Sequence, residues 1–193
     1  MQDELVRLKR STGTTFVHVT HDQEEACAIA DRIAVMDAGR IVQVDTPEAL
    51  YRAPRTSYVA SFIDAGTIVR GPSVREADVV QISHPDLVVR GRTPSHLNGA
   101  LPVAAVLPHD RVRVEPPGDG AEAANAVIGT VDRLVFTGSV FNAHVRVSDE
   151  LEIRAALTVE DVAKLGEEHV RPGGVVAVRW TPNDIVFVED SEQ

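Results

Sequence analysis

The stretch Phe16–Ala26, FVHVTHDQEEA, joins a short apolar segment to a run of acidic residues, with His21 at the junction. The residues before it, TTFVHVT (14–20), are β-branched and apolar in both alternating positions, a pattern typical of a buried parallel strand. Residues 21–32 are helix formers without Gly or Pro, and Thr20 followed by Gln23 fits a capping box. We therefore expect a strand over 14–20, a helix over 21–32, and His21 between them.

His21 would then occupy a favourable position for function, because ligands of parallel α/β sheets bind outside the carboxyl ends of the strands. Backbone N–H groups at the start of the following helix favour anions there, and an imidazole can donate to a phosphate oxygen. The plain alternative is a surface or half-buried histidine with one local hydrogen bond. We expect His18 only to pack. A metal pair of His18 and His21 lacks a third ligand at suitable spacing, so no metal site is predicted.

Residues 1–65 as a whole are predicted to alternate between helix and strand, as an α/β domain does. A helical stripe of apolar residues marks 1–11, and RIAVMDAGRIVQVD (32–45) is predicted to form a hairpin that turns at Asp37-Ala38-Gly39. Thr46 as N-cap and Pro47 as first residue open a predicted helix that ends before Pro54. One more short helix is expected over TSYVASFI (56–63).

Residues 66–193 have a different composition, rich in Val, Gly and Pro, and they indicate a small β-barrel or sandwich. The predicted strands are TIVRG (67–71), DLVVRG (86–91), PVAAVL (102–107), DRVRVE (110–115), NAVIGTVDRLVF (125–136), FNAHVRV (141–147), LEIRAAL (151–157), VVAVRW (175–180) and DIVFVE (184–189). One short helix is expected over 158–166, and an exposed loop over 116–125. The predicted organisation is two domains, 1–65 and 66–193.

Composition narrows the class of protein. The chain has 193 residues with 44% hydrophobic but only 4% aromatic side chains, so its core must be aliphatic. The formal net charge of −10 argues against a nucleic-acid binder, which normally has a basic face. Cys27 is the one cysteine, which excludes an intramolecular disulfide, and we expect it to be a small core residue of its helix. No apolar run reaches the roughly 20 residues that span a bilayer, and a cytoplasmic location is the default expectation.

Residues 15–54, TFVHVTHDQEEACAIADRIAVMDAGRIVQVDTPEALYRAP, resemble the closing segment of an ABC-transporter ATPase of the maltose, polyamine and iron importer type. The resemblance implies that residues 1–65 are an α/β fragment of a P-loop ATPase domain. It also implies that His21 is the switch histidine, catalytic and in contact with the γ-phosphate of ATP in a complete ATPase. The cofactors implied are ATP and Mg²⁺. The partners implied are permease subunits at the inner face of the membrane, which would hold the protein peripherally there, and a second ATPase subunit in a dimer.

The β half resembles the OB-like TOBE regulatory domain of the same subfamily. The closest similarities are GTVDRLVFTGSVFNAHVRV (129–147) and VAVRWTPNDIVFVED (176–190), which favour the polyamine and iron importer branch. The segment AVLPHD (105–110) departs from the family pattern, because Leu107 and His109 stand where Arg and Glu are usual. These changes affect any transfer of solute specificity or regulatory contacts from the family.

The sequence contains no Gly-x-x-x-x-Gly-Lys-Ser/Thr loop to cradle phosphates, since neither of its two lysines, Lys9 and Lys164, follows a glycine. Signature and Walker B motifs are also missing. We therefore expect the carboxyl-terminal part of an ATP-binding importer subunit that couples ATP hydrolysis to solute uptake, is inactive by itself and binds no nucleotide tightly. The alternative is a small oxyanion- or ligand-binding TOBE-type module without an ATPase role. Ser139, Asp132 and His144 lack the pattern of a hydrolase nucleophile and are interpreted as a chance combination.

Overall fold

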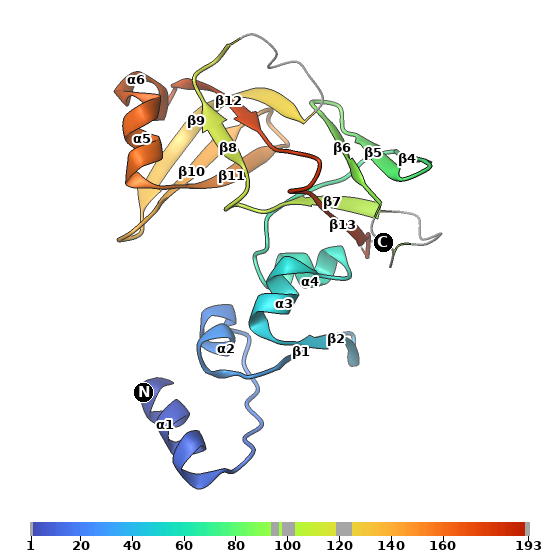
Figure 1. Cartoon of the computed structure of the whole chain (residues 1–193), viewed down its shortest axis with the longest axis vertical. Helices are drawn as coiled ribbons and strands as arrows, with labels where there is room; N and C mark the ends of the chain where they lie inside the picture. Colours follow the sequence, from blue (N-terminus) through green and yellow to red (C-terminus); the bar gives the residue numbers. More distant parts are fainter. Residues whose placement is uncertain (1, 94–96, 98–102, 119–124, 192–193) are drawn as a thin grey trace.

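The computed structural model describes residues 2–93, 97, 103–118 and 125–191 of the chain. Figure 1 shows a region of helices and one hairpin that leads into a larger region built of strands. Most of the predicted exposed loop over 116–125 lies outside the described residues, although Pro116–Gly118 are exposed. The fold is therefore mostly β, with its helices concentrated in the first third of the chain.

The first region follows the predicted order of helices and hairpin closely. Its elements are α1 (Gln2–Thr12), α2 (Gln23–Ile29), β1 (Ile33–Asp37), β2 (Arg40–Asp45), α3 (Pro47–Arg52) and α4 (Ser57–Phe62). Strands β1 and β2 pair antiparallel, and Ala38 and Gly39 turn between them with φ of 44° and 77°, as a two-residue hairpin requires. The Thr46 hydroxyl accepts from the Ala49 N–H at 3.2 Å, so Thr46 caps α3 as predicted.

The predicted strand over 14–20 is wrong. These residues run from α1 to α2 without pairing to any strand in the part of the chain that is described, and Val17 and Val19 are 91% and 90% exposed. A buried parallel strand needs neighbours on its edges and cover on both faces. Residues 2–65 supply neither, so the same sequence stays extended and open to solvent.

The second region consists of antiparallel strands. They are β3 (Thr67–Val69), β4 (Ser73–Glu76), β5 (Val79–Ser83), β6 (Val88–Arg92), β7 (Val103–Leu107), β8 (Arg113–Glu115), β9 (Ala126–Phe136), β10 (Phe141–Arg146), β11 (Glu152–Leu157), β12 (Val175–Arg179) and β13 (Val186–Glu189). They form three sheets with strand orders β11-β10-β9-β12-β8, β13-β7-β3 and β4-β5-β6. The predicted helix is α5 (Val159–Leu165), capped by Thr158 and Asp161 and followed by α6 (Glu167–Val170). Strands β4 and β5 were not predicted.

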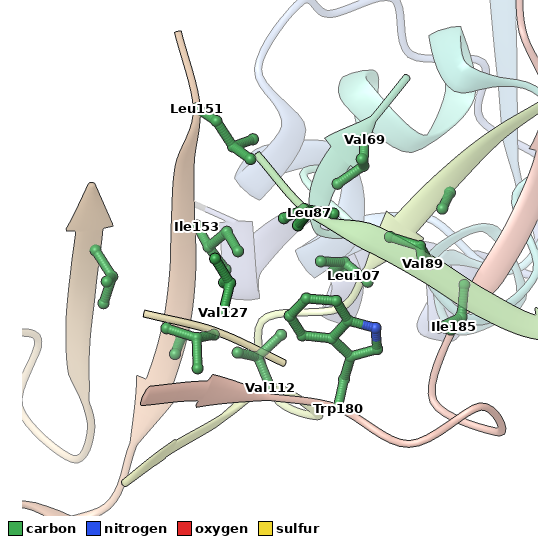
Figure 2. Close-up of a cluster of buried hydrophobic side chains, with 14 of the residues drawn as sticks. Val69, Leu87, Val89, Leu107, Val112, Val127, Leu151, Ile153, Trp180 and Ile185 are labelled. Atoms are coloured by element: carbon green, nitrogen blue, oxygen red, sulfur yellow. The ribbon is translucent and has the colours of Figure 1, made fainter. Parts of the chain in front are cut away.

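Two apolar cores hold the chain together, and strand β7 contributes to both. Val103, Ala105 and Leu107 face the larger core inside the three sheets, where Trp180 packs among aliphatic side chains (Figure 2). Ala104 and Val106 point the other way, into a second core. This second core contains Ala26, Ile33, Val35, Leu50, Val59, Ala60, Ile63, Ala65 and, from β13, Val188. All five residues of β7 are buried, because each face of the strand is covered by a different part of the molecule.

Asn125 is a buried polar hub within the larger β region. Its Oδ1 accepts from the backbone N–H of Arg90 at 2.7 Å and from Nε1 of Trp180 at 3.0 Å, and its Nδ2 donates to the Arg90 carbonyl at 2.8 Å. The side chain is 8% exposed and its φ is 67°, which Asn tolerates better than most residues. One side chain thus joins β6 to the start of β9 and the end of β12.

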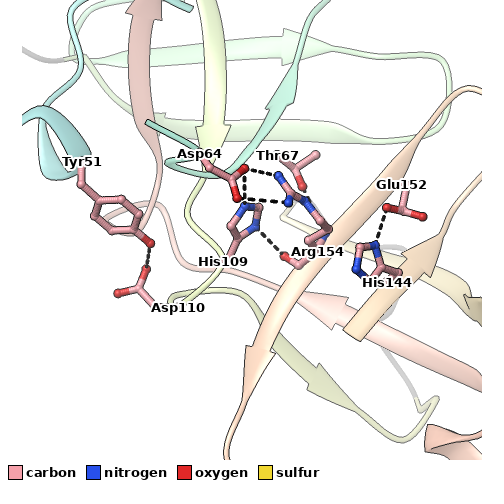
Figure 3. Close-up of polar contacts among 8 residues, drawn as sticks. All are labelled: Tyr51, Asp64, Thr67, His109, Asp110, His144, Glu152 and Arg154. Atoms are coloured by element: carbon pink, nitrogen blue, oxygen red, sulfur yellow. Dashed lines mark hydrogen bonds and ion pairs between the residues drawn. The ribbon is translucent and has the colours of Figure 1, made fainter. Parts of the chain in front are cut away.

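A polar cluster lies where the helices meet the strands (Figure 3). Asp64 follows α4 and has a left-handed backbone conformation, with φ of 51°. The N–H of Asp64 donates to the Ser61 carbonyl, and the N–H of Ala65 donates to the Ala60 carbonyl. This arrangement commonly ends a helix. Asp64 accepts both Arg154 guanidinium nitrogens, with Nη1 at 3.2 Å from Oδ2. Asp64 thus combines a positive φ, which is unusual for a residue other than glycine, with an ion pair to Arg154 of β11.

Two further contacts complete the cluster. His109 Nδ1 lies 3.2 Å from the Arg154 carbonyl and its Nε2 lies 3.5 Å from Asp64 Oδ1. The Tyr51 hydroxyl donates to Asp110 at 2.9 Å, and burial together with this carboxylate raises the pKa of Tyr51. His109, which departs from the family pattern, thus links the end of α4 to the strands, and its neighbour Asp110 links α3 to them.

Substitution of Asn125 is expected to destabilise the β region. Asn125→Ala leaves the Arg90 amide, the Arg90 carbonyl and Trp180 Nε1 without their partners, which costs about 2–3 kcal/mol of unfolding free energy. Denaturant unfolding measures this loss. Asn125→Gly separates the causes, since glycine relieves the positive φ: a full recovery of stability in that variant would assign the loss to backbone strain instead of hydrogen bonding.

Stability should respond to acid through Asp64. The nearby His109 ring, followed by the hydrogen-bonded Arg154 guanidinium, holds the pKa of Asp64 well below its usual range. A lowered folded-state pKa contributes stability above the unfolded value of about 3.9 and loses it as the pH falls through the folded value. Asp64→Asn is expected to lower the unfolding free energy at pH 7 by about 1 kcal/mol or less, because the pair is half exposed.

The difference between wild type and Asp64→Asn should shrink as the pH falls below about 4, where Asp64 of the unfolded chain binds a proton while Asp64 of the folded protein is still charged. Urea unfolding at a series of pH values provides the measurement, with the exposed Asp149→Asn as the matched control. A constant difference down to pH 2 would contradict a role for the Asp64 charge.

Backbone amides over residues 14–20 should exchange rapidly with solvent, because no described strand pairs with them. Amides of β7, buried on both faces, serve as the internal reference for slow exchange. Hydrogen exchange followed by NMR in the monomeric chain tests this contrast. Protection in 14–20 comparable to that in β7 would show that the segment is a paired strand in solution.

Candidate functional site

His21 is exposed and lies in a bend between the extended segment and α2. The helix begins at Gln23, two residues after the histidine, so the predicted order of extended segment, histidine and helix is present. The helix is shorter than predicted, because it ends at Ile29 instead of residue 32. The structure thus places His21 before a helix, while its assignment as a catalytic and ATP-binding residue stays a prediction.

The N-cap of α2 is Asp22, and the predicted capping box of Thr20 and Gln23 is wrong. The Asp22 Oδ1 accepts from the Glu25 N–H at 2.9 Å. The Thr20 hydroxyl accepts from the Asp22 N–H at 3.0 Å, which leaves it too far back in the chain to cap the helix. A cap at Asp22 also places a carboxylate in the stretch THD next to His21.

His18 does not pack in a core as expected. Its side chain is 47% exposed, and its Nε2 lies 3.2 Å from Glu25 Oε2. Hydrogen bonds from Thr20 first and His18 second lower the pKa of the Glu25 carboxyl. Among the residues that the structure describes, no three His, Cys, Asp or Glu side chains are grouped as a metal site would require.

A groove of about 620 Å³ runs beside the extended segment, on the side where α1 and the end of α2 converge. Its lining residues are Leu5, Val6, Gly13, Thr14, Thr15, Phe16, Val17, His18, Ile29, Ala30, Asp31 and Arg32. His18 belongs to this lining and His21 does not. The groove is mainly apolar, and it marks the surface of residues 1–45 that lacks a cover.

Two other residues singled out in the sequence have plain surroundings. Cys27 is exposed and not in the core as predicted, and partial burial raises the pKa of its thiol, so it is protonated at neutral pH. His144 Nδ1 lies 2.7 Å from Glu152 Oε1 (Figure 3). The same nitrogen lies 3.3 Å from an Arg133 guanidinium nitrogen. Ser139 lies in the exposed turn between β9 and β10, which agrees with a chance combination of triad residues.

The β region has its own cavity, of about 470 Å³, between α5 and strands β8 and β11. Its apolar lining residues are Val112, Val114, Pro116, Ala156, Leu157 and Leu165. Three carboxylates and two cations complete it, namely Asp110, Glu115, Asp161, Arg113 and Lys164. Lys164 is already paired with Glu160 at 2.8 Å and Glu115 with Arg179 at 3.2 Å. The lining is therefore largely apolar and carries one more carboxylate than cation.

Sequence patterns did not identify Glu25, Asp64 or Asn125 as important polar residues. The contacts of Asp64 and Asn125 join residues 90 and 35 positions apart in the chain, which no local pattern records. In the sequence, Glu25 is only one member of the acidic run that follows His21. Its proximity to His18 depends on how the extended segment lies against α2.

The comparisons with known proteins agree with this arrangement. The TOBE domain family matches residues 105–188. The spermidine/putrescine import ATP-binding protein PotA of Thermobifida fusca is 36% identical over 184 residues, which cover 94% of this chain and 47% of that protein. PotA of Nitrosospira multiformis is 32% identical over 201 residues, covering 100% and 53%. The putrescine transport ATP-binding protein PotG of Escherichia coli is 34% identical over 162 residues, covering 81% and 42%.

The chain spans about half the length of the curated relatives it matches. Among solved structures, the cytoplasmic molybdate-binding protein ModG, with molybdate bound, matches 64% of this chain and 92% of its own at 18% identity and a TM-score of 0.47. That likeness is too low to indicate a ligand for this chain. None of the described helices has the length and apolar character needed to cross a membrane.

The chain therefore belongs with the carboxyl-terminal part of the ABC importer ATP-binding subunits, and its residues 105–188 are a TOBE domain.

Proposed function

We propose that the chain is the carboxyl-terminal portion of the subunit that couples ATP hydrolysis to solute uptake in an ABC importer. The alignment of 94% of the chain with an ATP-binding importer protein at 36% identity is the observation that carries this proposal. Three relatives are named for spermidine or putrescine, which favours polyamines as the transported solutes over iron. The partners would be permease subunits at the cytoplasmic face of the membrane and a second ATP-binding subunit.

Within this proposal, residues 1–65 complete a P-loop α/β ATPase domain and residues 66–193 form its regulatory TOBE part. The boundary near residue 65 stays a prediction. The exposed segment 14–20 and the apolar groove beside it support the idea that residues 1–45 receive a cover from the nucleotide-binding half of such a subunit. His21 would contact the γ-phosphate of ATP, and Mg²⁺ would be held by the residues of that other half.

The charge of the β-region cavity argues against the alternative of an oxyanion-binding module. Three carboxylates line the cavity, and one of its two cations, Lys164, is already paired with a glutamate. An oxyanion would have to enter a site whose carboxylates repel it, without a free cluster of cations to offset that repulsion. The transport subunit therefore remains the better supported function.

ATP turnover provides the test. By itself the chain should hydrolyse no ATP, since its sequence offers no phosphate-cradling loop. Supplied with the amino-terminal half of the Thermobifida fusca relative, it should form an active reassembled subunit. In that subunit His21→Ala should lower kcat by roughly 10²–10³, the usual effect of removing one hydrogen-bond donor from a developing charge.

His169→Gln, a substitution of a histidine in the β region, is the matched control and should leave turnover unchanged. Full turnover by the reassembled subunit carrying His21→Ala would refute the role of His21. Turnover by the chain alone that is lost with His21→Ala would refute the need for the other half.

A further inference from the structure

His21 is attached to a segment that has little other support. Its neighbours Val17 and Val19 are almost fully exposed, and the segment pairs with no strand in the described part of the chain. A histidine that must meet a phosphate needs a defined backbone position, because a misplacement of about 1 Å can cost a hundredfold in rate. We therefore expect local contacts that fix the backbone of the bend at His21.

Two hydrogen bonds between backbone and side chains tie the bend around His21. The N–H of Asp22 donates to the Thr20 hydroxyl at 3.0 Å, which closes a tight turn around the histidine. The Asp22 carboxylate accepts from the Glu25 N–H at 2.9 Å, which fastens the far side of the turn to α2. The bend is thus connected to the helix on its carboxyl-terminal side.

The Glu25 carboxylate connects the amino-terminal side to the same helix. It lies 3.2 Å from His18 Nε2, and a hydrogen bond from Thr20 contributes most to its lowered pKa. His18 and Glu25 are seven residues apart, so this pair closes a loop that contains the bend. Val17 and Val19, on either side of His18, are exposed.

His21 itself is exposed and follows directly on this segment, in the bend that leads into α2. By pairing with His18, the Glu25 carboxylate limits how far the segment before the bend can move relative to the helix. A residue that acts only on helix stability would have no reason to contact position 18.

We propose that Glu25 is the positioning residue of His21: its carboxylate pairs with His18 and so holds the segment that carries the imidazole next to α2. The catalytic importance of this positioning rests on the proposed function. The contacts themselves, His18–Glu25, Asp22–Thr20 and Glu25–Asp22, are called the bracket below and do not depend on that function.

NMR on the full 193-residue chain tests the bracket directly. Loss of the Glu25–His18 contact in Glu25→Ala should loosen the turn, so amide exchange at Asp22 should be faster by about two- to fivefold. Glu25→Gln should show a smaller increase, because its amide oxygen can still accept a hydrogen bond from the His18 ring. Glu24→Gln removes the same charge from the same helical turn at an exposed site and should change nothing.

The amide of Ala26, which donates to the Asp22 carbonyl inside α2, reports on the helix alone. Faster exchange at Ala26 without a change at Asp22 would overturn the proposal, since Glu25 would then be only a helix residue. Unchanged exchange at Asp22 in Glu25→Ala would overturn it as well.

The reassembled subunit then separates positioning from the function itself. Glu25→Ala should lower kcat by a smaller factor than His21→Ala and leave KM for ATP nearly unchanged, with partial rescue by Glu25→Gln. A loosened bend with unchanged kcat in Glu25→Ala would overturn the catalytic part of the positioning. If Glu25→Ala loosens the bend but His21→Ala leaves kcat of the reassembled subunit unchanged, the proposed function is refuted while the contacts of Glu25 still stand.

Discussion

The burial of strand β7 on both faces is the constraint on which the rest of the structure depends. Successive side chains of a strand point to opposite sides, so Ala105 and Leu107 belong to the core of the strand region while Ala104 and Val106 belong to the core under α3 and α4. Complete burial of a Val or Leu side chain contributes about 1.5–3 kcal/mol. One strand of five residues therefore fixes the first helices and the sheets relative to each other.

The polar cluster at the junction contributes less stability than the apolar burial of β7. A half-exposed pair such as Asp64–Arg154 contributes about 1 kcal/mol or less, which is smaller than the burial of a single core valine. Its value lies in direction: a planar guanidinium that meets both carboxylate oxygens fixes how the end of α4 faces β11. Close approach adds a second geometric condition, since a Cβ on Gly66 would lie 2.3 Å from the Leu107 carbonyl oxygen.

Local chemistry explains which parts of the fold could be predicted from the sequence. Thr46 with Pro47 and the turn at Gly39 determine their structure within a few residues, so the helix and the hairpin were confirmed. The strands β4 and β5 were missed because their turn uses Ala77 at a φ of 50°, where a pattern search looks for Gly or Asn. The strand over 14–20 failed for the opposite reason, since its propensity is strong but its partners are missing from residues 2–65. At the candidate site the sequence indicated His21 but not Glu25, because that contact needs the segment to lie back against α2.

The double burial of β7 also decides where such a chain can be divided or recombined. A β region separated from its predecessor at residue 66 would carry Ala104, Val106 and Val188 as a bare apolar surface. Uncovered surfaces of this kind drive self-association. Exchange of the β region between related transporters would therefore succeed only if the hairpin and the helices up to Ala65 were exchanged together with the sheets.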